Sequence, residues 1–265
     1  MYSPLQLAVK YLNYLIIASN GKGHGMHSPF VFEFITKILN DKTVYPEYEK
    51  VETLRSQLLN DNRVLEVEDF GAGSTVDKKN NRRISSIAKN AAKPKKFGQL
   101  LFRMIKHYQP ATILELGTSL GITTSYLSLA KPDARLITME GSKEIADKAK
   151  QNLKAIELKN IELIEGNFDD TLSSAVRGLS SVDFAFIDGN HRKEPTERYF
   201  KELLAKTNNN SILVFDDIHW SSEMEAAWET IKNNAAVTCS IDLFFIGIVF
   251  FRKEFKEKQH FVIRY

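Results

Sequence analysis

The chain has 265 residues, of which 43% are hydrophobic and 26% are charged, a composition typical of a soluble globular protein. Its formal net charge of +3 is too small to indicate nucleic acid as a partner. Cys239 is the only cysteine, which excludes an intramolecular disulfide and a zinc site built from cysteines, and fits a reducing compartment.

The first expected element is a helix over residues 5–17. Lys10 and Asn13 interrupt its apolar run, and no small-residue cleavage pattern follows it. The run is also shorter than the ~20 apolar residues that span a bilayer. We therefore expect an amphipathic helix packed on the protein's own core, and a cytoplasmic protein without a membrane partner.

A second helix is expected to begin at Ser28-Pro29, because serine can cap free N–H groups and proline suits the first helical position. The glycine-rich link before it carries His24 and His27. These histidines could be metal ligands, but a polar loop or capping role is the simpler interpretation.

Residues 61–96 are polar, and from residue 75 onward they carry a single acid, Asp77. The basic residues in this stretch are Lys78, Lys79, Arg82, Arg83, Lys89, Lys93, Lys95 and Lys96. The segment is either a solvated stretch or an arm that attracts an anionic substrate.

From Phe97 onward, short β-rich runs alternate with amphipathic helical stretches. The expected strands are 112–117, 135–140, 161–166, 182–188, 211–217, 237–242 and 246–253. Such alternation predicts a parallel sheet covered by helices on both faces. The last two strands are joined by only residues 243–245, so they must form an antiparallel hairpin.

We therefore predict an α/β, Rossmann-like fold over residues 97–265. Its sheet is expected to be mostly parallel and seven-stranded, with an antiparallel terminal hairpin. Residues 1–96 are expected to form a helical and basic extension.

The first strand of this region runs into a glycine-bearing turn at residues 115–121, ELGTSLG. Gly117 and Gly121 let the backbone approach a ligand closely, and the next helix offers N–H groups at its N-terminus. A dinucleotide would favour G-x-G-x-x-G, whereas Ser119 stands where the second glycine would be. The second strand ends in Glu140, whose carboxylate can accept hydrogen bonds from ribose hydroxyls.

In combination, ELGxxxG at 115–121, ITME at 137–140 and EGN at 165–167 resemble the motifs of class I S-adenosylmethionine (SAM)-dependent methyltransferases. The resemblance covers residues 97–253 and is greatest to small-molecule O-methyltransferases of the catechol type. It implies that SAM is the cofactor, with Glu140 at its ribose. The predicted cofactor-binding residues are Glu115 and Gly117 near the methionine end, Thr118, Ser119 and Gly121 in the turn, Glu140, Asn167 and Phe168 beside the adenine, and Asp188.

Residues 64–74, VLEVEDFGAGS, also resemble a first cofactor motif. No second strand ending in an acid follows before residue 112. We interpret this stretch as a turn of the N-terminal region.

Two later strand ends carry acids: Asp188 closes the fourth strand, and Asp216 and Asp217 close the fifth. Ligands bind beyond the carboxyl ends of parallel strands, so these three carboxylates can converge and hold a hard cation such as Mg²⁺. Alternatively, one or more of them caps a helix. The resemblance implies a magnesium site here, although Asp217 stands where catechol-type enzymes have asparagine.

His191 lies three residues past Asp188, where catechol-type enzymes have a catalytic lysine. It is the predicted general base, with Asp188 as the second catalytic residue, although a structural role for His191 is also open. His219 and Lys193 are reserve candidates. In catechol-type enzymes, an acidic residue at the corresponding position binds catechol. This sequence has LFF there, at residues 243–245, so catechol itself is not expected to be the substrate.

The predicted function is Mg²⁺-assisted O-methylation of a small hydroxylated substrate, with residues 1–96 selecting the substrate or forming a homodimer. One alternative is a metal-independent methyltransferase acting on RNA or another macromolecule, as the basic segment would allow. The N/D-P-P-Y/F signature of many base N-methyltransferases is absent after the fourth strand, which disfavours nucleic acid. The other alternative is a catalytically inactive scaffold of the same fold.

Overall fold

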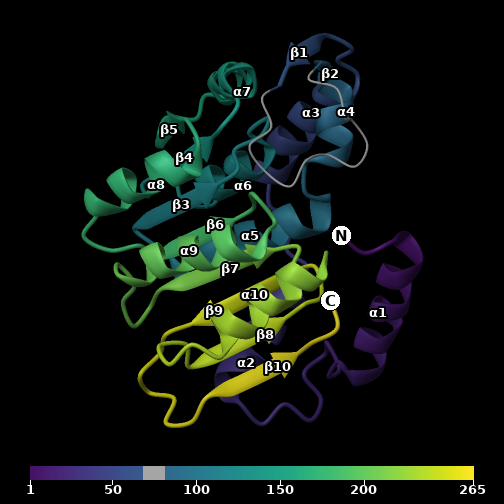
Figure 1. Cartoon of the computed structure of the whole chain (residues 1–265), viewed down its shortest axis with the longest axis vertical. Coiled ribbons are helices and arrows are strands. Elements are labelled where there is room, and N and C mark those ends of the chain that lie inside the picture. The colour runs from purple at the N-terminus through teal and green to yellow at the C-terminus, as the bar shows by residue number, and fades with distance from the viewer. Residues whose placement is uncertain (68–80) are drawn as a thin grey trace. The chain divides into compact units, whose positions relative to one another are not determined.

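The computed structural model describes residues 1–67 and 81–265 (Figure 1). The chain forms two compact units. One consists of Met1–Asp41 and Val176–Tyr265, and the other of Lys42–Ala175. Most of the turn predicted at residues 64–74, together with Asp77, Lys78 and Lys79, lies outside the described residues.

The unit Lys42–Ala175 contains the first three strands of the predicted sheet. They are β3 (Thr112–Leu116), β4 (Arg135–Glu140) and β5 (Ile161–Glu165), parallel to one another with β4 in the middle. The helices of this unit are α3 (Glu47–Leu59), α4 (Ile84–Asn90), α5 (Lys95–Tyr108), α6 (Ile122–Ala130), α7 (Lys143–Ala155) and α8 (Phe168–Arg177). The last two residues of α8 lie beyond the end of the unit at Ala175. β3 and β4 are mostly apolar and buried, as expected of parallel strands covered by helices, and Glu115 and Thr138 are buried polar residues within them.

The described part of the basic segment is folded rather than extended. β1 (Val64–Glu66) pairs antiparallel with β2 (Asn81–Arg83), and α4 follows directly. Ile84 and Ile87 of α4 are buried. Residues 81–90 are therefore folded, because the apolar residues between the basic ones bury one face of a short helix, while Arg83 and Lys89 stay exposed. Attraction of an anionic substrate by these basic residues stays a prediction.

The unit formed by Met1–Asp41 and Val176–Tyr265 holds the other strands, in the order β10-β8-β9-β7-β6. They are β6 (Phe184–Ile187), β7 (Ile212–Asp216), β8 (Cys239–Asp242), β9 (Ile246–Phe250) and β10 (Gln259–Val262). β6 and β7 are parallel, whereas β9 is antiparallel to both β7 and β8. The predicted terminal hairpin and the α/β class are confirmed, and β10, parallel to β8, is a strand that the sequence did not predict.

Helices cover both faces of β9. On one face, Gly247 has no side chain, and a Cβ there would lie 2.7 Å from the Trp228 ring of α10 (Ser222–Lys232). On the other face, Phe250 packs edge-on against Phe30 of α2 (Pro29–Glu33), with ring centroids 4.9 Å apart. α9 (Lys193–Leu204) packs beside α10. In Figure 1, these two helices lie in front of the strands of this unit.

The helix predicted to start at Ser28-Pro29 begins there and continues as a π-helix, η1 (Phe34–Leu39). Ser28 makes no side-chain capping bond, in contrast to the prediction. Its backbone carbonyl accepts the hydrogen bond from the Phe32 N–H at 2.8 Å, so the backbone rather than the hydroxyl sets the helix start.

The predicted N-terminal helix is α1 (Pro4–Ile17), and it packs on the protein's own core through one face. Ser3 and Gln6 form a reciprocal capping box that fixes its start. Tyr14 is buried with Phe244, and its hydroxyl donates a hydrogen bond to the Ile263 carbonyl next to β10. Among the described residues, no helix combines the length and apolarity needed to cross a membrane.

A network of charged side chains ties α1 to α10. The Glu225 carboxylate accepts hydrogen bonds from the Tyr2 hydroxyl at 2.6 Å and the Lys10 ammonium at 2.9 Å. The His219 ring lies between Glu225 and Asp242, with Nδ1 3.0 Å from Glu225 and Nε2 2.8 Å from Asp242. Burial alone would lower the pKa of His219, but its bonds to the two carboxylates outweigh burial and raise it.

Glu225→Gln is expected to reduce the free energy of unfolding by about 1–3 kcal/mol, because it removes the charge shared by three partners. Thermal denaturation should show a melting temperature several degrees lower. Glu229→Gln, on the same helix with a 60% exposed side chain, is the matched control and should change little.

The same network gives stability a defined pH dependence. Since folding raises the pKa of His219, its contribution is complete below the unfolded value of about 6.5 and is lost as pH rises through the folded value. The melting-temperature difference between wild type and Glu225→Gln should therefore shrink on going to alkaline pH. A difference that grows with pH would contradict this assignment.

Candidate functional site

The turn after β3 has a backbone that few residues adopt. Gly117, Ser119 and Gly121 all have positive φ, at 105°, 47° and 83°. A Cβ at Gly121 would lie 3.1 Å from the Leu153 side chain, so packing as well as backbone conformation favours glycine there. Gly121 is also the N-cap of α6, so the turn leads directly into the N-terminal N–H groups of that helix.

Glu140 lies at the end of β4, against this turn. One carboxylate oxygen accepts the Ser119 N–H at 2.9 Å, and the other accepts the Ser142 N–H at 3.0 Å. Two backbone N–H groups therefore hold the carboxylate in one orientation at the turn. A carboxylate can accept hydrogen bonds from the two hydroxyls of a ribose, and this role of Glu140 stays a prediction.

Glu115 is fully buried beneath the turn. One of its oxygens accepts hydrogen bonds from the Thr124 hydroxyl at 2.5 Å and the Thr138 hydroxyl at 2.6 Å. Since Thr138 donates its proton to Glu115, the Thr118 hydroxyl, 2.6 Å away, donates to Thr138. The carboxylate thus joins β3, β4 and α6 below the turn. Direct contacts of Glu115 and Thr118 with the cofactor stay predictions.

Sequence reasoning missed Thr124 and Thr138. The available signal was the presence of hydroxyl residues inside two buried segments, because a buried hydroxyl needs a hydrogen-bond partner.

Asn167 and Phe168 follow β5 at the same edge, since Glu140 and Glu165 are paired neighbours in register. The Asn167 side chain accepts the Asp169 N–H at 3.1 Å and its carbonyl accepts the Thr171 N–H at 3.0 Å. Asn167 therefore organises the first turn of α8, and Phe168 begins that helix half-buried. The unit Lys42–Ala175 brings the glycine turn, Glu140 and Asn167 to one end of its parallel strands.

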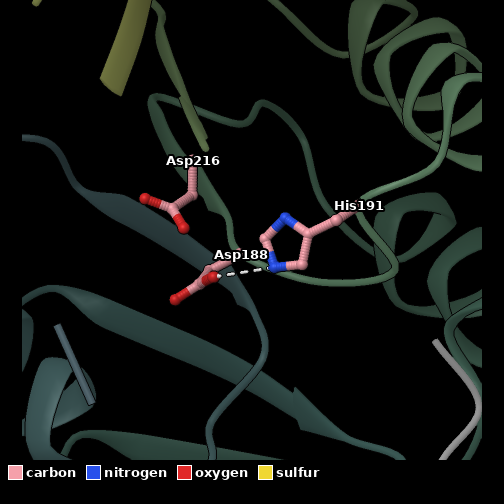
Figure 2. Close-up of side chains that lie close together, drawn as sticks. All are labelled: Asp188, His191 and Asp216. Carbon is pink, nitrogen blue, oxygen red and sulfur yellow. Dashed lines mark ion pairs between the residues drawn. The ribbon is translucent and has the colours of Figure 1, made fainter. Parts of the chain in front are cut away.

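The other unit places acidic residues beyond β6 and β7. Figure 2 shows Asp188, His191 and Asp216 turned toward one another, and their ligand atoms lie within 4.8 Å of each other. His191 Nε2 is 3.5 Å from an oxygen of Asp188, and Asp216 is only 1% exposed. Among the described residues this is the group with the composition and spacing of a metal site, so His24 and His27 do not form one.

Asp217 does not belong to this group of three. Its backbone turns away from the strand with a φ of 53°, and its N–H donates to the Phe245 carbonyl at 2.7 Å. The role of Asp217 as a metal ligand stays a prediction. The third member of the observed cluster, beside Asp188 and Asp216, is His191.

Two carboxylates close together repel each other, so a cation would stabilise the pair. Carboxylate oxygens suit Mg²⁺ and Mn²⁺, while an imidazole nitrogen favours transition metals. Asp188, His191 and Asp216 therefore fit a divalent ion, and Mn²⁺ accepts both kinds of ligand.

Backbone strain gathers at the same strand ends. In the described unit Met1–Asp41 with Val176–Tyr265, four non-glycine residues have positive φ, namely Asn190, His191, Asp217 and Phe244. They lie within four residues of the ends of β6, β7 and β8. Such residues cost of order 1–3 kcal/mol each and collect where ligands bind, which supports a functional site at this edge.

The reserve bases have other partners. Both ring nitrogens of His219 are engaged by Glu225 and Asp242. The backbone N–H of Lys193 donates to Glu223 at 3.3 Å, and its ammonium lies 4.0 Å from Glu197. His191 is the candidate that lies among the carboxylates.

Residues 114–218 match a family model described as a methyltransferase domain. A catechol O-methyltransferase from Niastella koreensis is 32% identical over 126 residues, which are 46% of this chain and 55% of that protein. A transmembrane O-methyltransferase homolog from Rattus norvegicus is 33% identical over 78 residues, 28% of this chain and 30% of that protein. The chain thus matches about half the length of the first relative and under a third of the second.

Solved structures confirm the fold. An S-adenosylhomocysteine-bound methyltransferase of Podospora anserina has a TM-score of 0.59 at 14% identity, covering 85% of this chain and 97% of that one. An O-methyltransferase of Bacillus cereus has a TM-score of 0.53 at 19% identity, covering 83% and 97%. At these identities the likeness concerns the Rossmann-like fold.

Proposed function

We propose that the chain, whose residues 114–218 match a methyltransferase domain, is a class I SAM-dependent enzyme that O-methylates a small hydroxylated molecule with a divalent cation. The observation that carries this proposal is the strained turn at Gly117–Gly121 closed by Glu140. Glu140 accepts the N–H of Ser119 in the turn as well as that of Ser142 before α7, so its carboxylate connects the end of β4 to the turn after β3.

In this proposal, each set of residues has one task. Glu140 binds the ribose hydroxyls, and the turn with Gly117 and Gly121 lets the cofactor lie close to the backbone. Asp188 and Asp216 would hold the cation, which would supply the positive charge that lowers the pKa of the acceptor hydroxyl. His191 accepts the proton of that hydroxyl, the new O–CH₃ bond forms, and the S–CH₃ bond of SAM breaks.

The relatives named above are O-methyltransferases, which favours methylation of a small molecule over RNA methylation or a scaffold role. The assignments of substrate selection or dimerisation to residues 1–96, and of the protein to the cytoplasm, stay predictions.

A direct assay tests the proposed activity. Purified protein would be incubated with SAM and a panel of catechols, hydroxybenzoates and hydroxylated aliphatic compounds, with either Mg²⁺, Mn²⁺ or EDTA. Mass spectrometry should detect S-adenosylhomocysteine and a methylated product in equal amounts for at least one acceptor. Turnover of RNA without turnover of any small molecule would support the alternative instead.

The hairpin after β8 suggests the chemistry of the acceptor. Phe245 is 42% exposed, and its carbonyl accepts the N–H of Asp217, next to the carboxylate cluster. The Tyr11 ring of α1 lies 5.9 Å from the Phe245 ring. The acceptor would therefore meet an apolar, aromatic surface here, where a catechol-type enzyme has an acid.

Phe245→Ala is expected to raise the KM for an aromatic acceptor about tenfold, because an aromatic contact contributes about 1–2 kcal/mol. The affinity for SAM should not change. Phe32→Ala removes a ring of similar exposure on α2, at 46%, and serves as the control with unchanged kinetics. An unchanged acceptor KM in Phe245→Ala would remove Phe245 from the acceptor site.

A further inference from the structure

One face of α1 is apolar and open to solvent. Leu5, Val9, Leu12 and Ile16 are 76%, 50%, 60% and 77% exposed. Single exposed apolar residues are normal on protein surfaces, but a contiguous row of four marks an interaction surface.

The helix cannot rotate to bury this row. Its opposite face is held by Tyr14 and Tyr11 against Phe244, and by the Lys10–Glu225 ion pair at 2.9 Å. In Figure 1, α1 lies at the edge of the unit to which it belongs, Met1–Asp41 with Val176–Tyr265. The apolar row is therefore a fixed feature of the folded chain.

The spacing of the row identifies the kind of surface it fits. Its members follow one another at intervals of four, three and four residues, which is the a/d spacing of two coiled-coil heptads. Such a seam packs against another helix with the same spacing. In an antiparallel pair related by twofold symmetry, Leu5 would face Ile16 of the other copy, and Val9 would face Leu12.

Charge also favours a second copy over a lipid surface. α1 has no acid in its first turn and no base in its last turn, and its single cation, Lys10, is bonded to Glu225. Two identical uncharged seams meet without repulsion. An amphipathic helix that binds anionic membranes normally carries exposed cations on its polar face, and α1 presents Gln6 and Asn13 there.

We propose that the exposed row of α1 binds the same row of a second copy of this chain, so that the protein is a homodimer joined by an antiparallel α1–α1 pair. The proposal goes beyond the methyltransferase activity, and its test requires no turnover.

Sedimentation velocity over a concentration series tests the pairing. Wild type should be a dimer that dissociates on dilution, and Leu12→Arg should raise the dissociation constant by at least about tenfold, because a charge in the seam remains desolvated and unpaired. Phe32→Arg changes an exposed apolar residue outside α1 and should leave the dimer intact. Circular dichroism would establish that each variant is folded.

A charge-swap variant tests the antiparallel register and covers the case in which Leu12→Arg does not fold. Val9→Glu combined with Leu12→Lys places opposite charges across an antiparallel pair but like charges across a parallel one. The double variant should dimerise more tightly than Leu12→Lys alone, and less so at high salt.

Several results would overturn the proposal. These are a wild-type monomer throughout the concentration series, a dimer unaffected by both Leu12→Arg and Leu12→Lys, or a dimer that Phe32→Arg also dissociates. Binding of monomeric wild type to vesicles of phosphatidylcholine and phosphatidylserine, lost in Leu12→Arg, would assign the row to a lipid surface instead.

Discussion

Glu140→Ala is expected to weaken the binding of SAM at least about tenfold, and more if both ribose hydroxyls depend on the carboxylate. A charge-assisted hydrogen bond contributes about 1.5–3 kcal/mol, and each 1.4 kcal/mol corresponds to a factor of ten. The substitution also frees the Ser119 and Ser142 N–H groups that the carboxylate holds. Isothermal titration calorimetry with SAM and with S-adenosylhomocysteine would measure the loss.

Two variants separate cofactor binding from damage to the turn. Glu144→Ala removes an exposed carboxylate from the first turn of the next helix and should bind SAM like wild type. Glu140→Gln keeps a side-chain oxygen that can accept a backbone hydrogen bond but loses the charge, so its affinity should lie between wild type and Glu140→Ala. A folded Glu140→Ala with wild-type affinity would disprove the ribose assignment.

Asp188→Asn is expected to abolish most of the stabilisation that a divalent ion gives the protein. In wild type, Mg²⁺ or Mn²⁺ should raise the melting temperature, because the ion binds the folded carboxylate pair and relieves its repulsion. Loss of a charged ligand next to buried Asp216 should weaken ion binding by tenfold or more. Thermal melts with increasing ion concentration, after treatment with EDTA, would measure the difference.

The same titration assigns the third ligand. If His191 binds the ion instead of accepting the proton of the acceptor hydroxyl, His191→Ala should reduce the response to Mn²⁺ more than Asp217→Asn does, because His191 lies in the cluster and Asp217 does not. Asp170→Asn, which changes an exposed acid in α8, is the control. Melting points and methyl transfer that ignore both EDTA and added ion would contradict the metal proposal, and His191 would then act without a cation.

The sequence by itself determined most strands of residues 97–253 because the relevant signals are local. Apolar runs such as 135–140 are buried on both faces and therefore readable as strands, and the short link at 243–245 leaves only a hairpin. The glycines of the turn and the acid ending β4 were readable for the same reason. Gly121 and Glu140 act through their own backbone conformation and strand position.

Only the tertiary structure decided how distant residues combine. Asp216 and Asp217 are equivalent in sequence, but Asp216 ends β7 facing Asp188, whereas Asp217 leaves the strand in the left-handed region. The chain turn that brings His191 to the same cluster has no local signature. β10 was also unreadable, because its pairing with β8 joins residues about twenty positions apart.

For the N-terminal helix, too, the sequence predicted the element and the tertiary structure decided its orientation. Its apolar residues predicted a helix, but both of its faces carry them, so the pattern could not say which face is buried. The contacts of Tyr14 with Phe244 and of Lys10 with Glu225 determine which face is buried. Local chemistry determines which elements form, whereas packing between remote segments determines which side chains they present to ligands and partners.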